Sequence, residues 1–447
     1  MEEKVTFKRT LTLFQVVALG LAWMSPMIYF TVYGIAYESS HGLMTSSYIV
    51  AAAAILITAL SYIAMSRAFP SSASAYTYVK KAIHPYAGFL VGWVVLLEYI
   101  FSPVISCLTF GLYMHAQFPE IPASVWIVSL SVIFAALNIV GIRFSAGLSK
   151  IFVIAQIAFV GLFCLFLLKA ILAPGGVSAA QALPVLPGWS VSAVLAGASL
   201  VCFSFLGFDT VTTLADETID ARRTIPKAIL WIVLIASALY ILISILTKLA
   251  FPVLSFANAD SAGYELVKLA GGAGLQAIFM TVLLLSVFTQ GVIAVTSASR
   301  LLHVMGSDST LPKRIFGRLH PRFKTPVNSI IVVCAISLLA LCLSLETSIK
   351  FVSLGALTAF VFVNASVVAQ LFMKERRRSP KETCTYLVLP LIGAGFTLWL
   401  LTLLDKTALT MGLIWLLSGI AYRFFRSSTL RAPLTQKRRF DWLRREG

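Results

Sequence analysis

The sequence is poor in charged residues, and this scarcity already limits the class of protein. Asp, Glu, Lys and Arg make up only 12% of the 447 residues, while hydrophobic residues make up 59%. Soluble domains average about 25% charged residues. Apolar runs of about 20 residues, the length at which a helix crosses the hydrocarbon core, recur along the chain. Ten-residue segments of alternating polarity, which a membrane barrel would need, are absent. We therefore predict an all-α integral membrane protein.

Further absences exclude several kinds of chemistry. The six cysteines lie in or beside apolar runs without a CxxC pair, so they predict neither a disulfide framework nor a metal site. The five histidines lie at the ends of runs or in loops, which argues against a histidine proton relay. No phosphate-binding loop is present, so an ATP-driven pump is excluded, and we predict no signal peptide. We expect that the protein is not an enzyme and that it uses no metal and no cofactor. A proton or ion gradient would be its energy source.

Twelve apolar runs predict twelve transmembrane helices. They cover residues 11–37, 46–69, 85–116, 123–142, 146–172, 191–215, 227–250, 273–303, 326–345, 349–373, 384–403 and 407–427. With the N-terminus inside, 30 of the 35 Lys and Arg residues fall in internal segments, and this asymmetry sets orientation. We predict a multi-pass protein of the cytoplasmic (inner) membrane with both termini in the cytoplasm. The net charge of +17 then faces anionic lipid and requires no nucleic acid.

Two acidic residues interrupt the apolar runs. Asp209 follows Gly207 in the sixth run, and Glu98 lies within GWVVLLEYIF in the third. An ionisable group at this depth is costly and normally faces a cavity or a partner, so both residues are candidates for a substrate or ion pathway. Two structural roles remain as alternatives. Glu98 would bond to neighbouring helices, and Asp209 would cap a helix end.

The first and sixth runs also contain helix breakers. Residues 23–27 read WMSPM, where Pro26 lacks a backbone donor. Residues 203–209 read FSFLGFD, which places Gly207 two residues before the acid. Broken helices at matching positions of two halves indicate a transporter binding site, because unwound backbone is tolerated only where it lines a cavity or is buried in protein. The alternative is that both residues merely kink their helices.

Four stretches resemble the amino acid–polyamine–organocation superfamily. FSFLGFDTVTTLADETIDARRTIPKAI (203–229) resembles its sixth-helix signature, and GWVVLLEY (92–99) its third-helix signature. PSSASAYTYVKKAIHP (70–85) and VMGSDSTLPKRIFGRLHPRFKTPVNSI (304–330) resemble its loops after helix two and between helices eight and nine. The resemblance extends over nearly the whole chain. Within the superfamily, the chain is most similar to bacterial putrescine importers.

The resemblance implies a LeuT-like inverted repeat of five plus five helices with broken helices 1 and 6. The implied parts are a cytoplasmic N-terminus (1–10), a first repeat (11–172), a second repeat (191–373), helices 11 and 12 (384–427) and a basic cytoplasmic tail (428–447). The substrate site would lie between the broken helices. The implied substrate-binding residues are Met24, Ser25, Tyr29, Thr31, Glu98, Ser102, Phe203, Ser204 and Asp209. Glu98 and Asp209 would also carry the coupled proton.

The chain departs from the family's patterns at three places. Amino-acid transporters of the family have a glycine-rich break in helix 1 whose amides bind a carboxylate, whereas here Pro26 removes one amide. This change favours an amine, which Asp209 and the half-helix carbonyls would attract. Thr31 stands where the putrescine importers have an aspartate. Gln156 stands where proton-coupled relatives have a lysine, so a lysine-for-sodium substitution is not predicted.

We therefore predict a secondary-active, proton-coupled importer of a small amine, polyamine or amino acid. The alternatives are an amine/amino-acid exchanger, a general amino-acid permease and a nutrient sensor with a transporter fold. The expected partners are this small molecule and membrane lipids, and the oligomeric state is left open. Asn138 and Asn364 are expected to bond across helices. The charges from Asp216 to Arg223 predict either a salt-bridge lock or a solvated loop. The tail segment 436–446 is predicted either to lie on the inner membrane surface or to be disordered.

Overall fold

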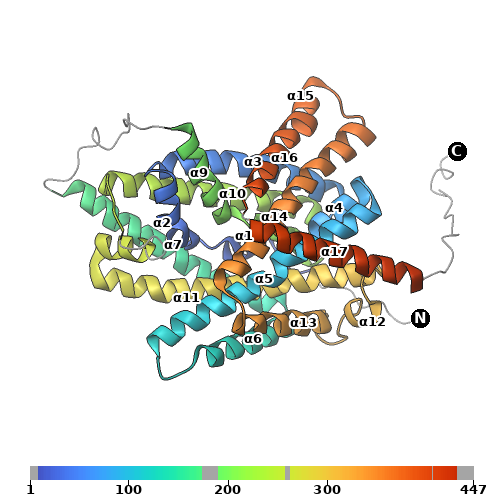
Figure 1. Ribbon diagram of the computed structural model, residues 1–447, viewed down its shortest axis with the longest axis horizontal. Helices are drawn as coiled ribbons and strands as arrows, with labels where there is room; N and C mark the ends of the chain where they lie inside the picture. Colours follow the sequence, from blue (N-terminus) through green and yellow to red (C-terminus); the bar gives the residue numbers. More distant parts are fainter. Residues whose placement is uncertain (1–8, 174–189, 257–261, 405, 430–447) are drawn as a thin grey trace.

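The apolar runs form a bundle of helices in the computed structural model, which describes residues 9–173, 190–256, 262–404 and 406–429 (Figure 1). The helices are α1 Leu13–Met24, α2 Ile28–Ser39, α3 Met44–Ala68, α4 Ser74–Ala82, α5 Pro85–Gln117, α6 Ala123–Val140, α7 Ile142–Leu172, α9 Val191–Val201, α10 Ala221–Ala250, α11 Ala262–Ser307, α12 Lys313–Phe316, α13 Val327–Ser337, α14 Leu345–Val367, α15 Pro380–Thr383, α16 Leu389–Thr402 and α17 Lys406–Thr429. Short 3₁₀ segments are η1 Cys202–Phe205, η2 Phe208–Glu217 and η4 Leu338–Leu341, and η5 Val368–Lys374 and η6 Cys384–Val388 are π-helical. No strand occurs in the described ranges.

Each predicted span contains an apolar helix. Among the described residues, ten helical segments are long and apolar enough to cross a membrane, or eleven when α1 and α2 count as one bent span. The segment Val327–Leu341 is apolar but shorter. The all-helical membrane fold is thus confirmed, whereas twelve crossings, the inverted repeat and the division into parts stay predictions. The tail beyond residue 429 lies outside the described residues.

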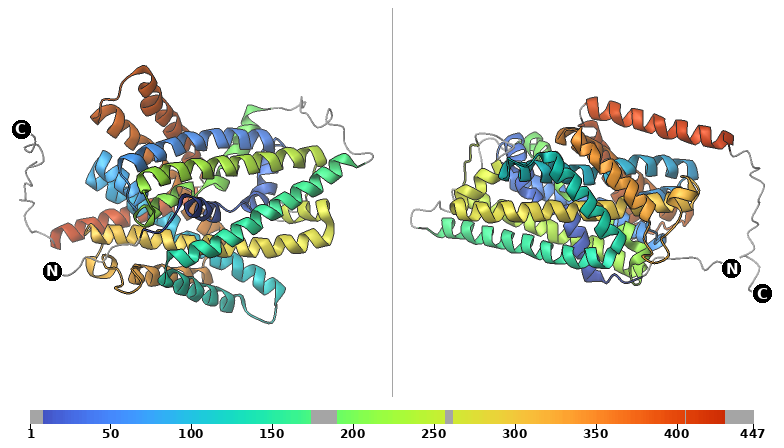
Figure 2. Two further views of the ribbon diagram at one scale, coloured as in Figure 1. Left: turned by 180° about the vertical axis from the view of Figure 1, so that it is seen from behind. Right: turned by 90° about the horizontal axis from the view of Figure 1, so that it is seen from below.

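The broken first helix lies at the centre of the bundle. α1 packs against α7, α10, α11 and η2, and its residues from Ala18 to Met24 are all buried. This part of α1 is apolar on every face, which suits a helix surrounded by others. Around it, α5 packs against α14 and α11, and α3 against α10. α17 lies on the outside of the bundle (Figure 2).

Polar residues within the spans join helices that are distant in sequence. The Asn138 side chain donates to the Val292 carbonyl at 3.2 Å and accepts from the Thr296 hydroxyl at 2.5 Å. The Asn364 side chain accepts from Ser61 at 2.7 Å and donates to Thr58 at 3.2 Å. The prediction that both asparagines bond across helices is therefore confirmed.

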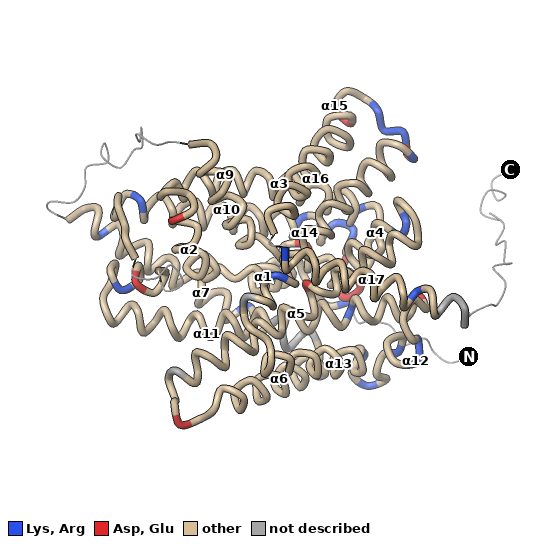
Figure 3. The backbone as a smooth tube through the Cα atoms, in the orientation of Figure 1, with Lys and Arg blue, Asp and Glu red and all other residues tan. Residues whose placement is uncertain are grey.

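The two ends of the described chain meet the same end of the bundle. The Thr10 amide donates to the Glu217 carbonyl at 2.8 Å, and Glu217 pairs with Arg300 near the end of α11. The Tyr422 hydroxyl of α17 donates to the carbonyl of Thr310, just after α11, at 3.3 Å. Most Lys and Arg residues lie on the side that holds α4, α12 and the turn before α15 (Figure 3).

Candidate functional site

The first helix is interrupted where the sequence predicts. α1 ends at Met24 and α2 begins at Ile28, with a bend of 43° between them. Ser25 has a φ of 52°, outside the right-handed helical region, and Pro26 disfavours the α conformation at the residue before it. Its amide still donates to the Leu21 carbonyl at 2.9 Å and closes the last turn of α1. The break is therefore an unwound segment and not a simple kink.

The sixth predicted helix is interrupted beside the break in the first. α9 passes into η1, Leu206 is extended with a ψ of 137°, and Gly207 has a φ of 100° before η2 begins. A φ in this range favours glycine. A Cβ atom on Gly207 would also collide with the Trp23 indole ring. The two breaks are thus in direct contact, and glycine permits this close approach.

Tyr240 of α10 links the two breaks. Its hydroxyl lies 3.2 Å from the Ser25 carbonyl and 3.3 Å from the Ser204 carbonyl, and it donates to both in a shared geometry. The side chain is almost fully buried, at 1% exposure. Sequence reasoning did not select this residue. The available signal was a single hydroxyl-bearing ring within the apolar run 227–250.

Asp209 connects η2 to the third predicted span. Its Oδ2 atom accepts a hydrogen bond from the Tyr99 hydroxyl at 3.0 Å, and Oδ1 has no described partner. The Tyr99 ring in turn meets the Trp23 ring edge-on, with centroids 5.8 Å apart. Tyr99 therefore uses one carboxylate oxygen of Asp209, and the other oxygen is left for another group.

Glu98 is completely buried in α5, one residue before Tyr99. Neither carboxylate oxygen has a hydrogen-bond partner among the described residues. Gly355 of α14 packs directly against its backbone, where a Cβ atom would collide. Tyr99, the sequence neighbour of Glu98, is the residue that donates to Asp209. A structural hydrogen bond to a neighbouring helix is therefore not formed here.

Further polar atoms without partners surround the breaks. The Tyr29 ring stacks on Tyr48 and Tyr240 at centroid distances of 5.5 and 6.5 Å. In the described residues, the hydroxyls of Tyr29, Tyr48 and Ser204 have no hydrogen-bond partner. Gln156 of α7 accepts from the Ser25 hydroxyl at 3.1 Å, and its amide nitrogen is also unpartnered. Buried polar groups normally bond to protein or water, so this cluster has the capacity to hold a polar ligand.

The other candidates differ in their placement. Met24 is buried at the end of α1, and Phe203 is half-buried in η1. The Ser102 hydroxyl is buried and donates to the Glu98 carbonyl at 2.7 Å. Thr31 is exposed and donates to the Ile28 carbonyl of its own helix. Two positions along a helix amount to about 200° of rotation, so Thr31 faces away from Tyr29 and is not brought to the cluster.

A buried ion pair lies at the end of η2. The Arg300 guanidinium of α11 is 2.7 Å from Glu217 Oε1, and both side chains are at most 5% exposed. The sequence predicted either a lock within residues 216–223 or a solvated loop. Glu217 instead pairs across the bundle with Arg300, while Arg223 makes only an exposed 3.7 Å contact with Asp220. The predicted lock is therefore wrong for Glu217, whereas the exposed Asp220 and Arg223 side chains agree with the solvated-loop alternative.

These observations define the class of protein. A bundle of apolar helices, with two helices broken against each other beside two buried carboxylates, is a transporter of small solutes across a membrane. The chain belongs to the amino acid permease family, whose sequence model matches residues 14–419. The predicted superfamily is thus confirmed. Members of this family are permeases and not enzymes.

Curated relatives cover nearly the whole chain. The low-affinity putrescine importer PlaP of Escherichia coli (strain K12) is 36% identical over 439 residues, which span 97% of each chain. The branched-chain amino acid permease BcaP of Bacillus subtilis (strain 168) is 26% identical over 94% of each chain. Cationic amino acid transporter 4 of Mus musculus is 28% identical over 83% of this chain and 61% of its own. All three transport amines or amino acids by name.

Proposed function

We propose that this chain is a secondary-active importer of a small amine such as putrescine, coupled to the proton gradient or the membrane potential. The observation that carries the proposal is Asp209, a buried carboxylate at the break of the sixth helix, one oxygen of which has no hydrogen-bond partner among the described residues. A carboxylate in this setting attracts an ammonium group, because charge-assisted hydrogen bonds are the strong ones. The similarity to PlaP supports the same substrate class.

The start of α2 argues against a carboxylate substrate. Pro26 has no amide hydrogen, and the next two amides are already used within the break. The Met27 amide donates to the Ser25 hydroxyl at 3.2 Å, and the Ile28 amide donates to the Ser25 carbonyl at 3.0 Å. A helix N-terminus binds anions through amides that are free to donate. This N-terminus therefore offers little to the carboxylate of an amino acid.

Glu98 is our candidate for the residue that carries the transported proton. Neither oxygen of Glu98 has a hydrogen-bond partner among the described residues, and its sequence neighbour Tyr99 donates to Asp209, so an ammonium bound at Asp209 would alter the field at Glu98. A change in the protonation of Glu98 when the substrate binds would couple proton movement to substrate transport. The 30-to-5 distribution of basic residues supports cytoplasmic termini, and the similarity to the importer PlaP supports import across the inner membrane.

Substitution of the two acids tests the proposal. Purified protein in proteoliposomes would be assayed for putrescine binding, exchange and proton-driven accumulation. Asp209→Asn should weaken putrescine binding by at least about 1.5–3 kcal/mol, the range for a hydrogen bond to a charged group. Glu98→Gln should keep binding and exchange but lose accumulation. Asp220→Asn, at an exposed acid, is the matched control and should behave like the wild type.

Two outcomes would overturn these assignments. Putrescine affinity at the wild-type level in Asp209→Asn would remove its anchor role, and intact proton-driven accumulation in Glu98→Gln would leave Glu98 a structural residue. Two alternative functions give different results in the same assays. An exchanger would require substrate on the opposite side for any uptake. The similarity to BcaP favours an amino-acid permease as the second candidate. Tight binding of zwitterionic amino acids without amine binding would select the permease. For an amine importer, we expect putrescine to outcompete ornithine.

A further inference from the structure

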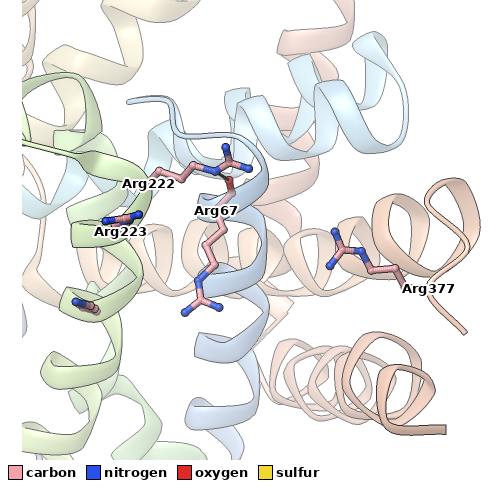
Figure 4. Close-up of a pocket in the computed structure, with 5 residues that line it drawn as sticks. Arg67, Arg222, Arg223 and Arg377 are labelled. Atoms are coloured by element: carbon pink, nitrogen blue, oxygen red, sulfur yellow. Dashed lines mark hydrogen bonds between the residues drawn. The ribbon is translucent and has the colours of Figure 1, made fainter. Parts of the chain in front are cut away.

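A pocket lined entirely by basic side chains lies apart from the broken helices. Its volume is about 570 Å³, and its lining residues are Arg67, Arg222, Arg223, Lys227 and Arg377. They come from the end of α3, the start of α10 and the segment between η5 and α15. In Figure 4, Arg222 reaches across from α10 to the end of α3, where its Nε donates to the Arg67 carbonyl at 3.1 Å.

The positive charge of the pocket is only partly balanced. Asp220 lies 3.7 Å from Arg223, and Glu375 lies 2.9 Å from Arg377. Across the described ranges, Arg67, Arg222 and Lys227 have no ion-pair partner. These side chains are exposed at the rim of the pocket, so water solvates each of them. These basic side chains nevertheless place several cationic hydrogen-bond donors around a single pocket.

The position of two arginines strengthens this argument. Arg222 and Arg223 lie in the first turn of α10, a helix of 30 residues. The macrodipole of a helix favours anions at its N-terminus and disfavours cations there. The sequence therefore places positive side chains where the helix itself already attracts negative charge. Side chains and helix end act together on an anion in the pocket.

We propose that this pocket binds a phosphate-bearing anion, which is either the headgroup of an anionic phospholipid or a soluble diphosphate. Arginine suits such a ligand because its planar group binds phosphate oxygens in pairs. The volume lies within the range of about 300–1,000 Å³ usual for small-ligand pockets. Basic pockets between transmembrane helices are known to take lipid headgroups. This inference does not depend on the transported substrate.

The alternative is that these residues only set membrane orientation and attract anionic lipid without a defined site. A pair of charge-matched variants separates the two. Arg222→Gln/Lys227→Gln removes two charges from the pocket. Lys313→Gln/Arg314→Gln removes two exposed charges from α12, outside the pocket, and is the control. Arg67→Gln provides a second pocket variant if the first double variant folds poorly.

The full chain would be purified in an uncharged detergent and titrated at about 0.15 M salt, where remote surface attraction is largely screened. The probes are inorganic pyrophosphate, cardiolipin and, as a zwitterionic lipid, phosphatidylcholine. Native mass spectrometry counts the bound molecules, and the titration gives the dissociation constant. We expect one saturable equivalent of a phosphate-bearing probe. The pocket variants should bind it about tenfold or more weakly, and the control within about twofold of wild type.

The arms of the experiment identify the source of the anion. Binding of pyrophosphate as tight as that of cardiolipin assigns the site to a soluble phosphate compound. Binding of cardiolipin alone assigns it to a lipid headgroup. The proposal is overturned if neither probe saturates, if phosphatidylcholine binds equally well, or if the α12 control loses as much affinity as the pocket variants.

Discussion

Tyr240→Phe is the substitution that tests most directly whether the two helix breaks act as one unit. The ring would stay in place between Tyr48 and Phe205, whose centroids lie 5.5 and 5.4 Å away. Only the hydroxyl is lost, and with it the contact to both breaks. The Ser25 carbonyl keeps the Ile28 amide as a donor at 3.0 Å, whereas the Ser204 carbonyl keeps no described partner.

The expected magnitude follows from this asymmetry. A buried acceptor left unsatisfied costs about 1–3 kcal/mol, while a hydrogen bond exchanged with water changes stability by about 0.5–1.5 kcal/mol. Tyr240→Phe should therefore lower the free energy of unfolding by about 1–3 kcal/mol, mainly through Ser204. Because both carbonyls belong to the breaks, substrate affinity should fall as well.

Unfolding of the purified protein and substrate binding in proteoliposomes would be measured together. Tyr48→Phe is the matched control for stability, because its hydroxyl has no described partner and its loss should leave unfolding unchanged. A Tyr240→Phe protein that unfolds and binds like the wild type would refute the linkage. Equal destabilisation by Tyr48→Phe would show that the ring environment, and not the shared hydrogen bond, determines the effect.

Three further predictions concern the breaks, the ion pair and the topology. Gly207→Ala should abolish substrate binding, because the φ of 100° and the Trp23 indole ring leave no room for a Cβ atom. Gly395→Ala, which lies in open space, is the control and should be tolerated. Equal substrate binding by the two variants would contradict this prediction. Glu217→Gln removes the carboxylate that pairs with the buried Arg300 guanidinium and should destabilise the protein by about 3–5 kcal/mol; the additional Arg300→Gln change should recover part of this loss in unfolding measurements. Ser307→Cys should resist impermeant thiol reagents in sealed cells, and labelling from outside would reverse the proposed orientation.

The sequence alone determined the features that depend on local backbone chemistry and on hydrophobic length. The apolar runs located the helices, because a bilayer-spanning helix needs a minimum apolar length whatever surrounds it. Pro26 located the first break, since proline removes a donor wherever it occurs. Gly207 located the second in the same way, through the positive φ that glycine permits. The family was also predicted from these segments, because their order along the chain is part of the sequence itself.

Only the tertiary structure decided which residues meet. Tyr240 joins Ser25 and Ser204 across 215 and 36 positions of sequence, so no local pattern marks it. Glu217 finds Arg300 rather than its sequence neighbours because the packing of η2 on α11 brings them together. Thr31 lies one helical face away from the cluster, a matter of rotation that motif alignment does not fix. Side-chain direction and helix packing are set by the whole bundle, and the candidate site is a product of both.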